Sequence, residues 1–528
     1  MKNNILKYSS VSFFIIIICF SCFLVYRNNK KEIKNDNNKN KQIVSSDVIS
    51  KELSIGIVKM DSINPLVSKN EKVYEISKLI FDSLFSMDKE YKLTLNLVEE
   101  CSNINNLTYI IKLKKDVYWH DLSPFTARDV EFTINKLIEP NVDSIYKTNV
   151  ANINQIEIID ENTIKIFLNS PDKFFEYNLI FPILSEKSYK SEDFSSNSKN
   201  IIGTGAYKIS EINEDIITLS LFEEWWNTEK NQIKTVRIKL YDSAGVMYSD
   251  FKKKQIDMIT TSNVDWKNLI GKIGYNYIEY PGREYDFLTF NCENNVLKNI
   301  EVRKAISLAI NKNDIITEVY SAGKIISDYP LSYGSYLYSE NGMGYNIDKA
   351  KNTLKDGGWE YNSNVWQKNI NDKVVKTNLT LLVNYNNEDM SKVADIIKKE
   401  LDSIGIRITI KKLGNSEYLE TIISNNFDIA LMGLYISHIP NLNLFFGEDN
   451  YANYEDEELT EIMRAMNEAS ENDLSRIYKQ LQEYYNENFM YVSLYFDKNI
   501  LAYNKNLIMD ASPTWYDVFY NMRTWYKK

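Results

Sequence analysis

The sequence predicts an α/β protein: one large body whose lobes are formed by excursions of a single chain. From Glu52 onward, short strand-like runs alternate with amphipathic helical patterns. Residues 375–412 read as strand, helix, strand, which is the pattern of a βαβ unit. The 528 residues include only 9 Pro and 17 Gly, and no low-complexity linker divides the body. These observations favour a continuous mixed fold over a string of separate domains.

Strands and helices are predicted in alternation along the first part of the body. A strand is predicted at "LSIGIV", and the run "EKVYEISKLIFDSLF" forms one apolar helical face. That face consists of Val73, Ile76, Leu79, Ile80 and Leu84. Alternation predicts a strand at "TYIIKLKKDVYW", and further strands at "IEIID" and "TIKIFL". A helix is predicted at "TARDVEFTINKLI", because Thr126 is an N-cap candidate and acidic residues occupy its first turns.

The second part of the body continues the pattern. A buried helix is predicted at "VRKAISLAI", where apolar residues recur at helical spacing. They are Val302, Ala305, Ile306, Ala309 and Ile310. The βαβ unit is predicted from "VVKTNLTLLVNY", "MSKVADIIKKELDSIGI" and "RITIKKL". The stretch Leu431–Phe446, "LMGLYISHIPNLNLFF", is neither a clean strand nor a clean helix, because polar residues and Pro440 interrupt it.

The N-terminus has a basic start, an apolar stretch from Val11 to Tyr26, and a polar tail. As a helix the apolar stretch would be about 24 Å long, somewhat short of the roughly 30 Å core of a bilayer. Residues 1–26 are therefore expected to be a secretory signal or an uncleaved membrane anchor. Cys22 follows a small serine and is a lipidation candidate, although its bulky neighbours fit that pattern poorly. Residues 27–50 are expected to form a flexible polar tether.

Charge is divided unevenly along the chain. Residues 1–42 contain eight Lys or Arg and two Asp or Glu, a net charge of +6. The remainder holds 54 basic and 70 acidic side chains, a net charge of −16. A body this acidic argues against nucleic-acid binding, which needs basic surface to neutralise phosphates.

Motifs typical of enzymes are missing from the sequence. It contains no HExxH, no G-x-S-x-G, no Walker A loop and no G-x-G-x-x-G. Residues 203–205, "GTG", are interpreted as a tight turn before a strand, and the acidic run Tyr454–Met463 as the start of an exposed helix. Two histidines, His120 and His438, are a thin supply for a transition-metal site. No catalytic residue, metal site or cofactor is predicted. Cys101 and Cys292 are expected either to pair or to stay free.

Several segments, in order, resemble the extracellular solute-binding proteins of peptide and nickel ABC importers, often called family 5. The longest, "YIIKLKKDVYWHDLSPFTARDVEFTINKL", is similar to the family's strand, "W/F-H-D-G" turn and "T-A-x-D-V" helix. Leu122 stands where the family usually has glycine. The other similar segments are Asn64-Pro65 with the helix ending "FDSLFSMD", Gly203–Ile209, Leu288–Ile316 and Tyr345–Trp359. The resemblance runs from about residue 52 to the C-terminus.

The resemblance implies a two-lobed fold of the periplasmic-binding-protein type, with a ligand held between lobes that close around it. Lobe I is expected to comprise residues 51–90, 198–280 and 496–528. An inserted subdomain II is expected at residues 91–197, and lobe III at residues 281–495. In peptide-binding members the ligand lies extended and pairs with strand edges through its main chain. A carrier of this kind releases its substrate unchanged, which agrees with the missing catalytic motifs.

The resemblance also implies ligand-facing residues. Lys69, Asn70 and Glu71 fall where relatives place one ligand-facing edge, with a solvated loop as the plain alternative. Tyr146 aligns with a tyrosine that lines the cleft of peptide binders, with a packed ring as the alternative.

The stretch around His438 aligns with a "W-x-x-D-Y-x-x-P" segment of oligopeptide binders. Leu434 then stands at the tryptophan, Ser437 at the aspartate that pairs with the peptide ammonium, and His438 at the tyrosine. A shift of one residue would exchange these roles, so Tyr435 is also a candidate. A buried ammonium without a carboxylate partner is costly. Therefore another acid supplies the charge, or the terminus lies in solvent, or the ligand is not an ordinary free peptide.

The resemblance implies a binding protein, not an enzyme, that captures short peptides and delivers them to the membrane subunits of an ABC permease. We expect a monomer at the extracytoplasmic face of the cell membrane, held by its N-terminal anchor. Two alternatives are a sensor of the same fold that binds a non-standard peptide or another small solute and, more remotely, an enzyme of unknown type.

Overall fold

The computed structural model describes residues 51–190, 201–229, 231–271 and 274–528. The anchor at residues 1–26, with Cys22, and the tether at 27–50 lie outside these described residues. Within the described residues, no helix is both long enough and apolar enough to cross a membrane. Ser50–Lys528 forms one compact unit.

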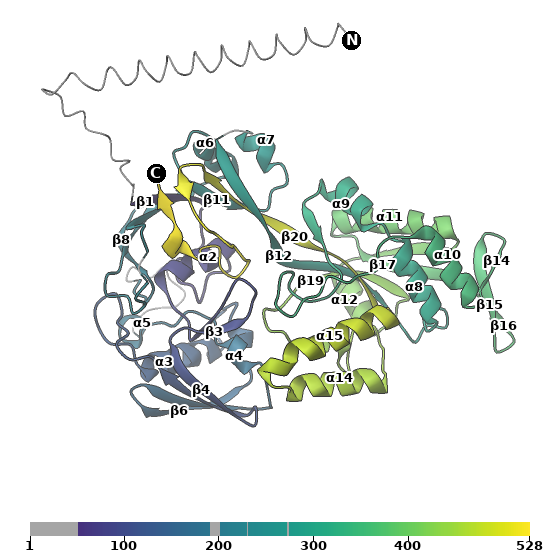
Figure 1. Cartoon of the computed structure of the whole chain (residues 1–528), viewed down its shortest axis with the longest axis horizontal. Coiled ribbons are helices and arrows are strands. Elements are labelled where there is room, and N and C mark those ends of the chain that lie inside the picture. The colour runs from purple at the N-terminus through teal and green to yellow at the C-terminus, as the bar shows by residue number, and fades with distance from the viewer. Residues whose placement is uncertain (1–50, 191–200, 230, 272–273) are drawn as a thin grey trace, which may run out of the picture. The chain divides into compact units, whose positions relative to one another are not determined.

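The largest sheet among the described residues has 11 strands and extends through most of the body (Figure 1). Ten of its strands lie in one continuous order, and β13 (Lys324–Ile326) pairs with β20 beside that path. The order is β18 (Arg407–Leu413), β17 (Asn378–Asn384), β19 (Ile429–Tyr435), β12 (Tyr275–Phe290), β20 (Tyr491–Asn504), β11 (Met258–Thr261), β1 (Glu52–Val58), β10 (Thr235–Tyr241), β9 (Ile216–Leu221) and β8 (Tyr207–Ile212).

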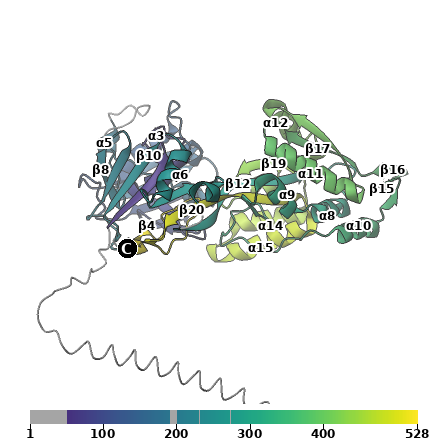
Figure 2. The ribbon, with the colours of Figure 1, turned by 90° about the horizontal axis from the view of Figure 1, so that it is seen from above.

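Two long antiparallel strands, β12 and β20, join the two halves of this sheet (Figures 1 and 2). The first half of β12, Tyr275–Pro281, pairs with the part of β20 that also pairs with β11. From Glu284 onward β12 pairs with β19, and its register with β20 shifts between Pro281 and Tyr285. We call residues 281–285, with Asp497 of β20, the strand crossing. The chain passes from one half of the sheet to the other at this crossing.

A second, four-stranded antiparallel sheet is formed by residues 98–168. Its order is β4 (Val98–Ile104), β5 (Thr108–Leu113), β7 (Thr163–Leu168) and β6 (Ile153–Asp160). Helix α3 (Ala127–Ile138) packs on it, and the predicted N-cap Thr126 forms a capping box with Asp129 in the first turn. The strands predicted at "IEIID" and "TIKIFL" are confirmed as parts of β6 and β7.

Helices cover the rest of the body. They are α2 (Glu71–Ile80), α4 (Phe175–Asn178), α5 (Glu186–Tyr189), α6 (Ala244–Lys252), α7 (Trp266–Ile270), α8 (Ile300–Ala309), α9 (Lys312–Tyr320), α10 (Ile347–Asp356), α11 (Glu388–Ile404), α12 (Asn415–Ile423), α13 (Asn443–Phe446), α14 (Glu457–Glu468) and α15 (Glu471–Asn488). The βαβ unit is confirmed, because β17 and β18 pair in parallel and α11 connects them.

The remaining short strands form three small sheets. They are β2 (Phe85–Met87) with β3 (Leu93–Leu95), β14 (Glu360–Asn362) with β15 (Val365–Ile370) and β16 (Lys373–Lys376), and β21 (Leu507–Ile508) with β22 (Tyr526–Lys527).

Helix α2 is shorter than its apolar pattern predicted. It ends at Ile80, so the prediction that Leu84 continues the helical face is wrong, although Leu84 is buried. The Ile80 carbonyl accepts a hydrogen bond from the Gly205 N–H (2.9 Å). A Cβ at Gly203 would stand only 1.8 Å from that same carbonyl oxygen. The "GTG" turn therefore needs glycine because its backbone lies directly against the end of α2.

Candidate functional site

An aromatic cluster surrounds Arg283 at the strand crossing. We call it the crossing cluster, and it consists of Arg283, Tyr74, Tyr146, Tyr435, His438, Trp515 and Tyr516. The guanidinium carbon of Arg283 lies 4.6 Å from the ring centre of Trp515 and 6.0 Å from that of Tyr435. Its Nε donates a hydrogen bond to the Ile436 carbonyl (3.3 Å). Because Arg283 lies within the register shift between Pro281 and Tyr285 of β12, the crossing itself positions this cation.

The tyrosines of the crossing cluster come from distant parts of the chain. The Tyr74 ring, on α2, lies 6.5 Å from that of Tyr146 and 6.2 Å from that of Tyr516. Burial raises the pKa of the Tyr146 phenol, the neighbouring Tyr516 adds to that rise, and Arg283 opposes it. Tyr146 is 5% exposed and also packs against Phe181. It is thus a packed ring that stands within the electrostatic reach of Arg283.

His438 follows β19 of the large sheet and contacts the segment that contains Tyr177. Its Nε2 donates to the Tyr177 carbonyl (2.9 Å), and its ring centre lies 6.3 Å from that of Trp515. The pKa of His438 is lowered to about 3, chiefly by burial, and the nearby Arg283 and Lys78 contribute to this shift. The imidazole is therefore neutral at physiological pH, with the proton on Nε2 because a carbonyl can only accept. Such a group orients polar partners and supplies no charge.

Three acidic residues and one lysine lie close together at the strand crossing. The Nζ of Lys324 is 3.4 Å from Glu284 Oε2 and 3.6 Å from Asp286 Oδ2. Asp497 accepts a hydrogen bond from the Glu284 N–H (2.8 Å). Burial raises the pKa of Asp286 to about 7 and that of Asp497 to about 6, while Lys324 lowers both. Three carboxyl groups around one ammonium therefore favour a bound proton near neutral pH.

The three predicted residues before and at the start of α2 have different surroundings. Lys69 is exposed and forms an ion pair with Asp143. The Asn70 side chain caps α2 by accepting from the Lys72 N–H (2.8 Å). Burial raises the pKa of the Tyr435 phenol, and the charge of the exposed Glu71 adds to that rise. Of the three, Glu71 is the one with an electrostatic effect on the crossing cluster.

The predicted residues of the Leu434–His438 stretch also differ from one another in their surroundings. Leu434 is half-buried within β19 and pairs with Tyr285 of β12. Tyr435 is 66% exposed and stands directly opposite Glu284 in the sheet. Ser437 is exposed, and its Oγ accepts from the Ile439 N–H (3.1 Å). Tyr435 and His438 therefore join the crossing cluster, and Ser437 borders it next to the carbonyl that Arg283 contacts.

Comparison with known proteins decides the family. The model of the family described as "Bacterial extracellular solute-binding proteins, family 5 Middle" matches residues 92–453. The chain belongs to this family.

Relatives of this family 5 protein share low sequence identity over most of the chain. It is 24% identical over 468 residues to the oligopeptide-binding protein AppA of Bacillus subtilis, covering 84% of this chain and 86% of AppA. It is 24% identical over 358 residues to the dipeptide-binding protein of Escherichia coli, covering 62% of this chain and 64% of that protein. The solved structure of HbpA2 from Haemophilus parasuis superposes with a TM-score of 0.76 at 18% identity, covering 89% of this chain and 99% of HbpA2. These similarities confirm the two-lobed α/β fold.

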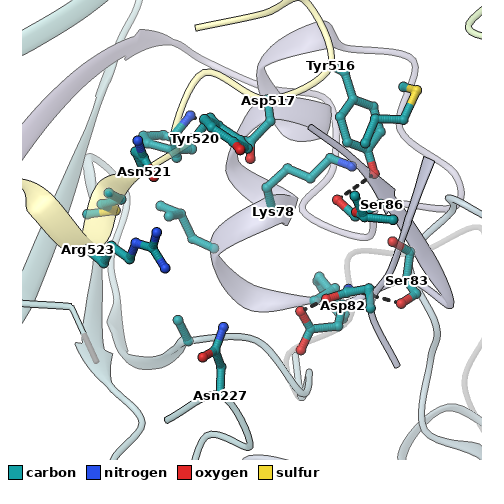
Figure 3. Close-up of a pocket in the computed structure, with 18 of the residues that line it drawn as sticks. Lys78, Asp82, Ser83, Ser86, Asn227, Tyr516, Asp517, Tyr520, Asn521 and Arg523 are labelled. Atoms are coloured by element: carbon teal, nitrogen blue, oxygen red, sulfur yellow. Dashed lines mark hydrogen bonds between the residues drawn. The ribbon is translucent and has the colours of Figure 1, made fainter. Parts of the chain in front are cut away.

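A cavity of about 380 Å³ lies between the C-terminal end of α2 and residues 516–523 (Figure 3). We call it the α2 pocket. The Lys78 side chain extends across it toward Tyr516, while Asn521, Arg523 and Asn227 lie on other sides (Figure 3). Asp82 in its wall accepts from the indole N–H groups of Trp226 (2.9 Å) and Trp225 (3.4 Å). This carboxylate fixes the two tryptophans and is fully engaged by protein donors.

A second cavity, of about 770 Å³, separates β3 and β4 from the helices α14 and α15. Its charged lining is mostly acidic, because five glutamates, among them Glu99, Glu176 and Glu471, accompany a single lysine, Lys173. Lys92 pairs with Glu471 (3.2 Å), and Lys173 donates to the Ala469 carbonyl. These two contacts bridge segments that are far apart in the sequence at the edge of the cavity.

His120 is held by the backbone of the "GTG" turn, and neither Cys101 nor Cys292 forms a disulfide. His120 accepts from the Gly203 N–H at Nδ1 (3.2 Å) and donates from Nε2 to the Gly205 carbonyl (3.0 Å). Cys101 and Cys292 are free, which settles the two alternatives left open by the sequence. Asp456 caps α14, so the acidic run is the start of a helix, as interpreted. Among the described residues, no group of three or more His, Cys, Asp or Glu is arranged to hold a metal ion.

Sequence reasoning missed Arg283, Lys78, Tyr74 and Trp515. None of them belongs to a recognisable motif, and they come from α2, β12 and the C-terminal segment. The one available signal was the "PGRE" run inside a strand-like stretch, because Pro and Gly there indicate an irregular strand.

Proposed function

We propose that this family 5 protein captures short peptides between two lobes and delivers them to the membrane subunits of an ABC importer. The proposal rests on one observation above all: the crossing cluster gathers aromatic side chains from four distant segments around a half-buried arginine. This cluster lies where the two crossing strands change partners. Domain closure about such a crossing would bring its two sides together around a ligand. AppA and the dipeptide-binding protein, whose names state peptide binding, support the substrate class.

We propose the lobe boundaries expected from the sequence. Residues 51–90, 198–280 and 496–528 form lobe I, residues 91–197 form subdomain II, and residues 281–495 form lobe III. The register shift between Pro281 and Tyr285 supports the boundary near residue 280. The independent four-stranded sheet at residues 98–168 supports the inserted subdomain.

The proposed ligand site comprises the crossing cluster and its border. Tyr435 and His438 contribute from lobe III, Tyr146 from subdomain II, and Glu71 from the start of α2. Lys69, Asn70, Leu434 and Ser437 are proposed as its outer edge. Aromatic faces accept many side chains, whereas the peptide main chain finds polar groups at fixed positions, so selectivity for sequence is expected to be loose.

We propose that the protein is a carrier and not an enzyme. We propose that it acts as a monomer on the extracytoplasmic side of the membrane. Residues 1–26 would hold it there as a transmembrane anchor, or Cys22 would do so through a lipid. The family, which is extracellular, supports this location.

Thermal unfolding with synthetic peptides tests the proposal. The full chain in a mild detergent should show a higher Tm with a pool of peptides of two to six residues. The exposed Tyr435 gives a variant that spares the core, so Tyr435→Ala should lose at least half of the shift. Tyr345→Ala is the matched control, because Tyr345 is 50% exposed on another segment. A shift with sugars or metal chelates and none with peptides would reject the peptide assignment.

A further inference from the structure

Arg283 has hydrogen-bonding capacity that the described protein does not use. Only its Nε has a protein acceptor, the Ile436 carbonyl. Within the described residues, no acid lies within ion-pair distance of its guanidinium. The nearest acids in sequence and structure are engaged elsewhere, since Glu284 pairs with Lys324 and Asp497 accepts from the Glu284 N–H. Four N–H groups of a half-buried guanidinium therefore remain available.

A second donor lies against the same cation. The Trp515 ring stacks beside the guanidinium, with 4.6 Å between the guanidinium carbon and the ring centre. Its indole Nε1 is buried and finds no hydrogen-bond partner among the residues that the structure describes. A buried donor without an acceptor is costly, and a ligand oxygen would satisfy it.

Two cations, Arg283 and Lys78, lie on this side of the cluster. Lys78 lies over the Tyr516 ring at 3.4 Å from its centre and makes no ion pair in the described part of the chain. Burial raises the pKa of Asp517, although Lys78 is close enough to oppose that rise. Arg283 and Lys78 both act on His438, whose imidazole is neutral and therefore cancels none of this charge. Arg283 likewise lowers the pKa of Tyr74 and Tyr146 against the effect of burial.

The opposite side of the cluster is negative. At the exposed Tyr435, the charges of Glu284, Glu71 and Asp497 outweigh that of Arg283. A group with a positive end and a negative end would thus find a complementary surface. An inorganic anion such as phosphate would match only the first side.

We infer that Arg283 holds a carboxylate of the bound peptide, with the Trp515 indole as a second donor, so that the protein selects ligands carrying a free carboxylate at this end. The inference rests on the proposed function. A guanidinium whose Nε is fixed presents its remaining N–H groups as a planar fork, which suits the two oxygens of a carboxylate. That carboxylate belongs either to the peptide C-terminus or to an acidic side chain, and these two sources call for different probes.

Three peptide pools distinguish these sources. All contain peptides of two to six residues. The first pool has neutral side chains and free C-termini, and the second has the same sequences as C-terminal amides. The third consists of C-terminal amides that carry one Asp or Glu. The full chain is incubated with each pool, and bound peptides are measured by native mass spectrometry and by calorimetry. We expect free acids to bind about tenfold or more tightly than neutral amides, the effect of one charge-assisted contact. Recovery of binding in the acidic amides would assign the carboxylate to a side chain.

Variants of Arg283 complete the experiment. Arg283→Gln should bind free acids and neutral amides equally, and Arg283→Lys should keep part of the preference, since it retains the charge and loses the fork. Arg464→Gln is the control, because Arg464 is 67% exposed on α14 and pairs only with Glu461. Equal Tm values for the variants show that folding is intact.

Two results would overturn the inference. Equal binding of acids and amides by the unaltered protein is one, and an unchanged preference in Arg283→Gln is the other. In both cases peptides still bind, so the proposed function stands. If no pool binds at all, the proposed function fails and this inference fails with it.

Discussion

Replacement of Asp286 by asparagine should change how stability depends on pH. Asp286 is 2% exposed, and its Oδ1 has no partner among the described residues. Its pKa is raised from 3.8 to about 7, chiefly by burial, with Lys324 opposing and Glu284 adding to the rise. The folded protein therefore binds this proton more tightly than the unfolded chain does. The free energy of unfolding must fall as pH rises from about 4 to about 7.

The magnitude follows from the change in proton affinity. Each tenfold change is worth ~1.4 kcal/mol, so the full rise corresponds to about 4 kcal/mol. An asparagine side chain cannot ionise, and it keeps the shape of the protonated aspartic acid. The unfolding free energy of Asp286→Asn, measured relative to the unaltered protein, should therefore increase by about 4 kcal/mol between pH 4 and pH 7 and stay constant above that range.

Urea denaturation of the full chain at several pH values measures this difference. Asp121→Asn is the control, because the pKa of Asp121 is lowered to about 2. Burial by itself would raise this pKa, but the hydrogen bonds from Ser123 and Lys187 outweigh the effect of burial. The stability due to Asp121 is lost only as pH falls below about 4, so its variant should run parallel to the unaltered protein above pH 5. If the Asp286→Asn curve also runs parallel there, Asp286 does not hold a proton and the account of the crossing is wrong.

Three further predictions follow from single positions. Leu122 has a φ of +66° and is 58% exposed, so Leu122→Gly should raise the unfolding free energy by roughly 1 kcal/mol in urea, whereas Leu122→Ala, which keeps a Cβ, should not. A Cβ at Gly282 would stand 2.0 Å from an Asp497 oxygen, so Gly282→Ala should cost about 1.5–3 kcal/mol by breaking the Asp497 bond to the Glu284 N–H. Gly245→Ala, in α6 with nothing within 4 Å, should instead gain about 0.5–1 kcal/mol, and equal effects of the two would contradict the close approach. Burial lowers the pKa of His120 to about 4 and that of His438 to about 3, so neither imidazole proton signal should titrate by NMR between pH 5 and 8; a midpoint near 6.5 would refute their buried settings.

Local patterns in the sequence predicted most of the secondary structure. The N-cap at Thr126 and the βαβ unit of β17, α11 and β18 depend on neighbours in the chain, and both were predicted. The end of α2 was not, because the Gly205 N–H that engages the Ile80 carbonyl is more than a hundred residues away. Where a long-range backbone contact competes with helical periodicity, the pattern alone overestimates the helix.

The candidate site was predictable only in part, for the same reason. Tyr146, Tyr435 and His438 were named through the family resemblance, and all three lie within the electrostatic reach of Arg283. Arg283 and Trp515 are more than two hundred residues apart, and no local spacing signals that their side chains stack. Leu122 shows the converse case: the backbone keeps the left-handed turn even though the glycine usual in the family is replaced.

The position of β20 constrains how this chain reaches its native state. It occupies the middle of the largest sheet, between β12 and β11, yet it comprises residues 491–504 of 528. The edges of β12 and β11 that face each other across β20 stay unpaired until residues 491–504 have been synthesised. Pairings between residues so distant in sequence form slowly, because the loop-closure entropy is lost before the contacts are gained. A nascent chain therefore leaves β11 and β12 without their shared partner until the segment that follows α15 has been synthesised.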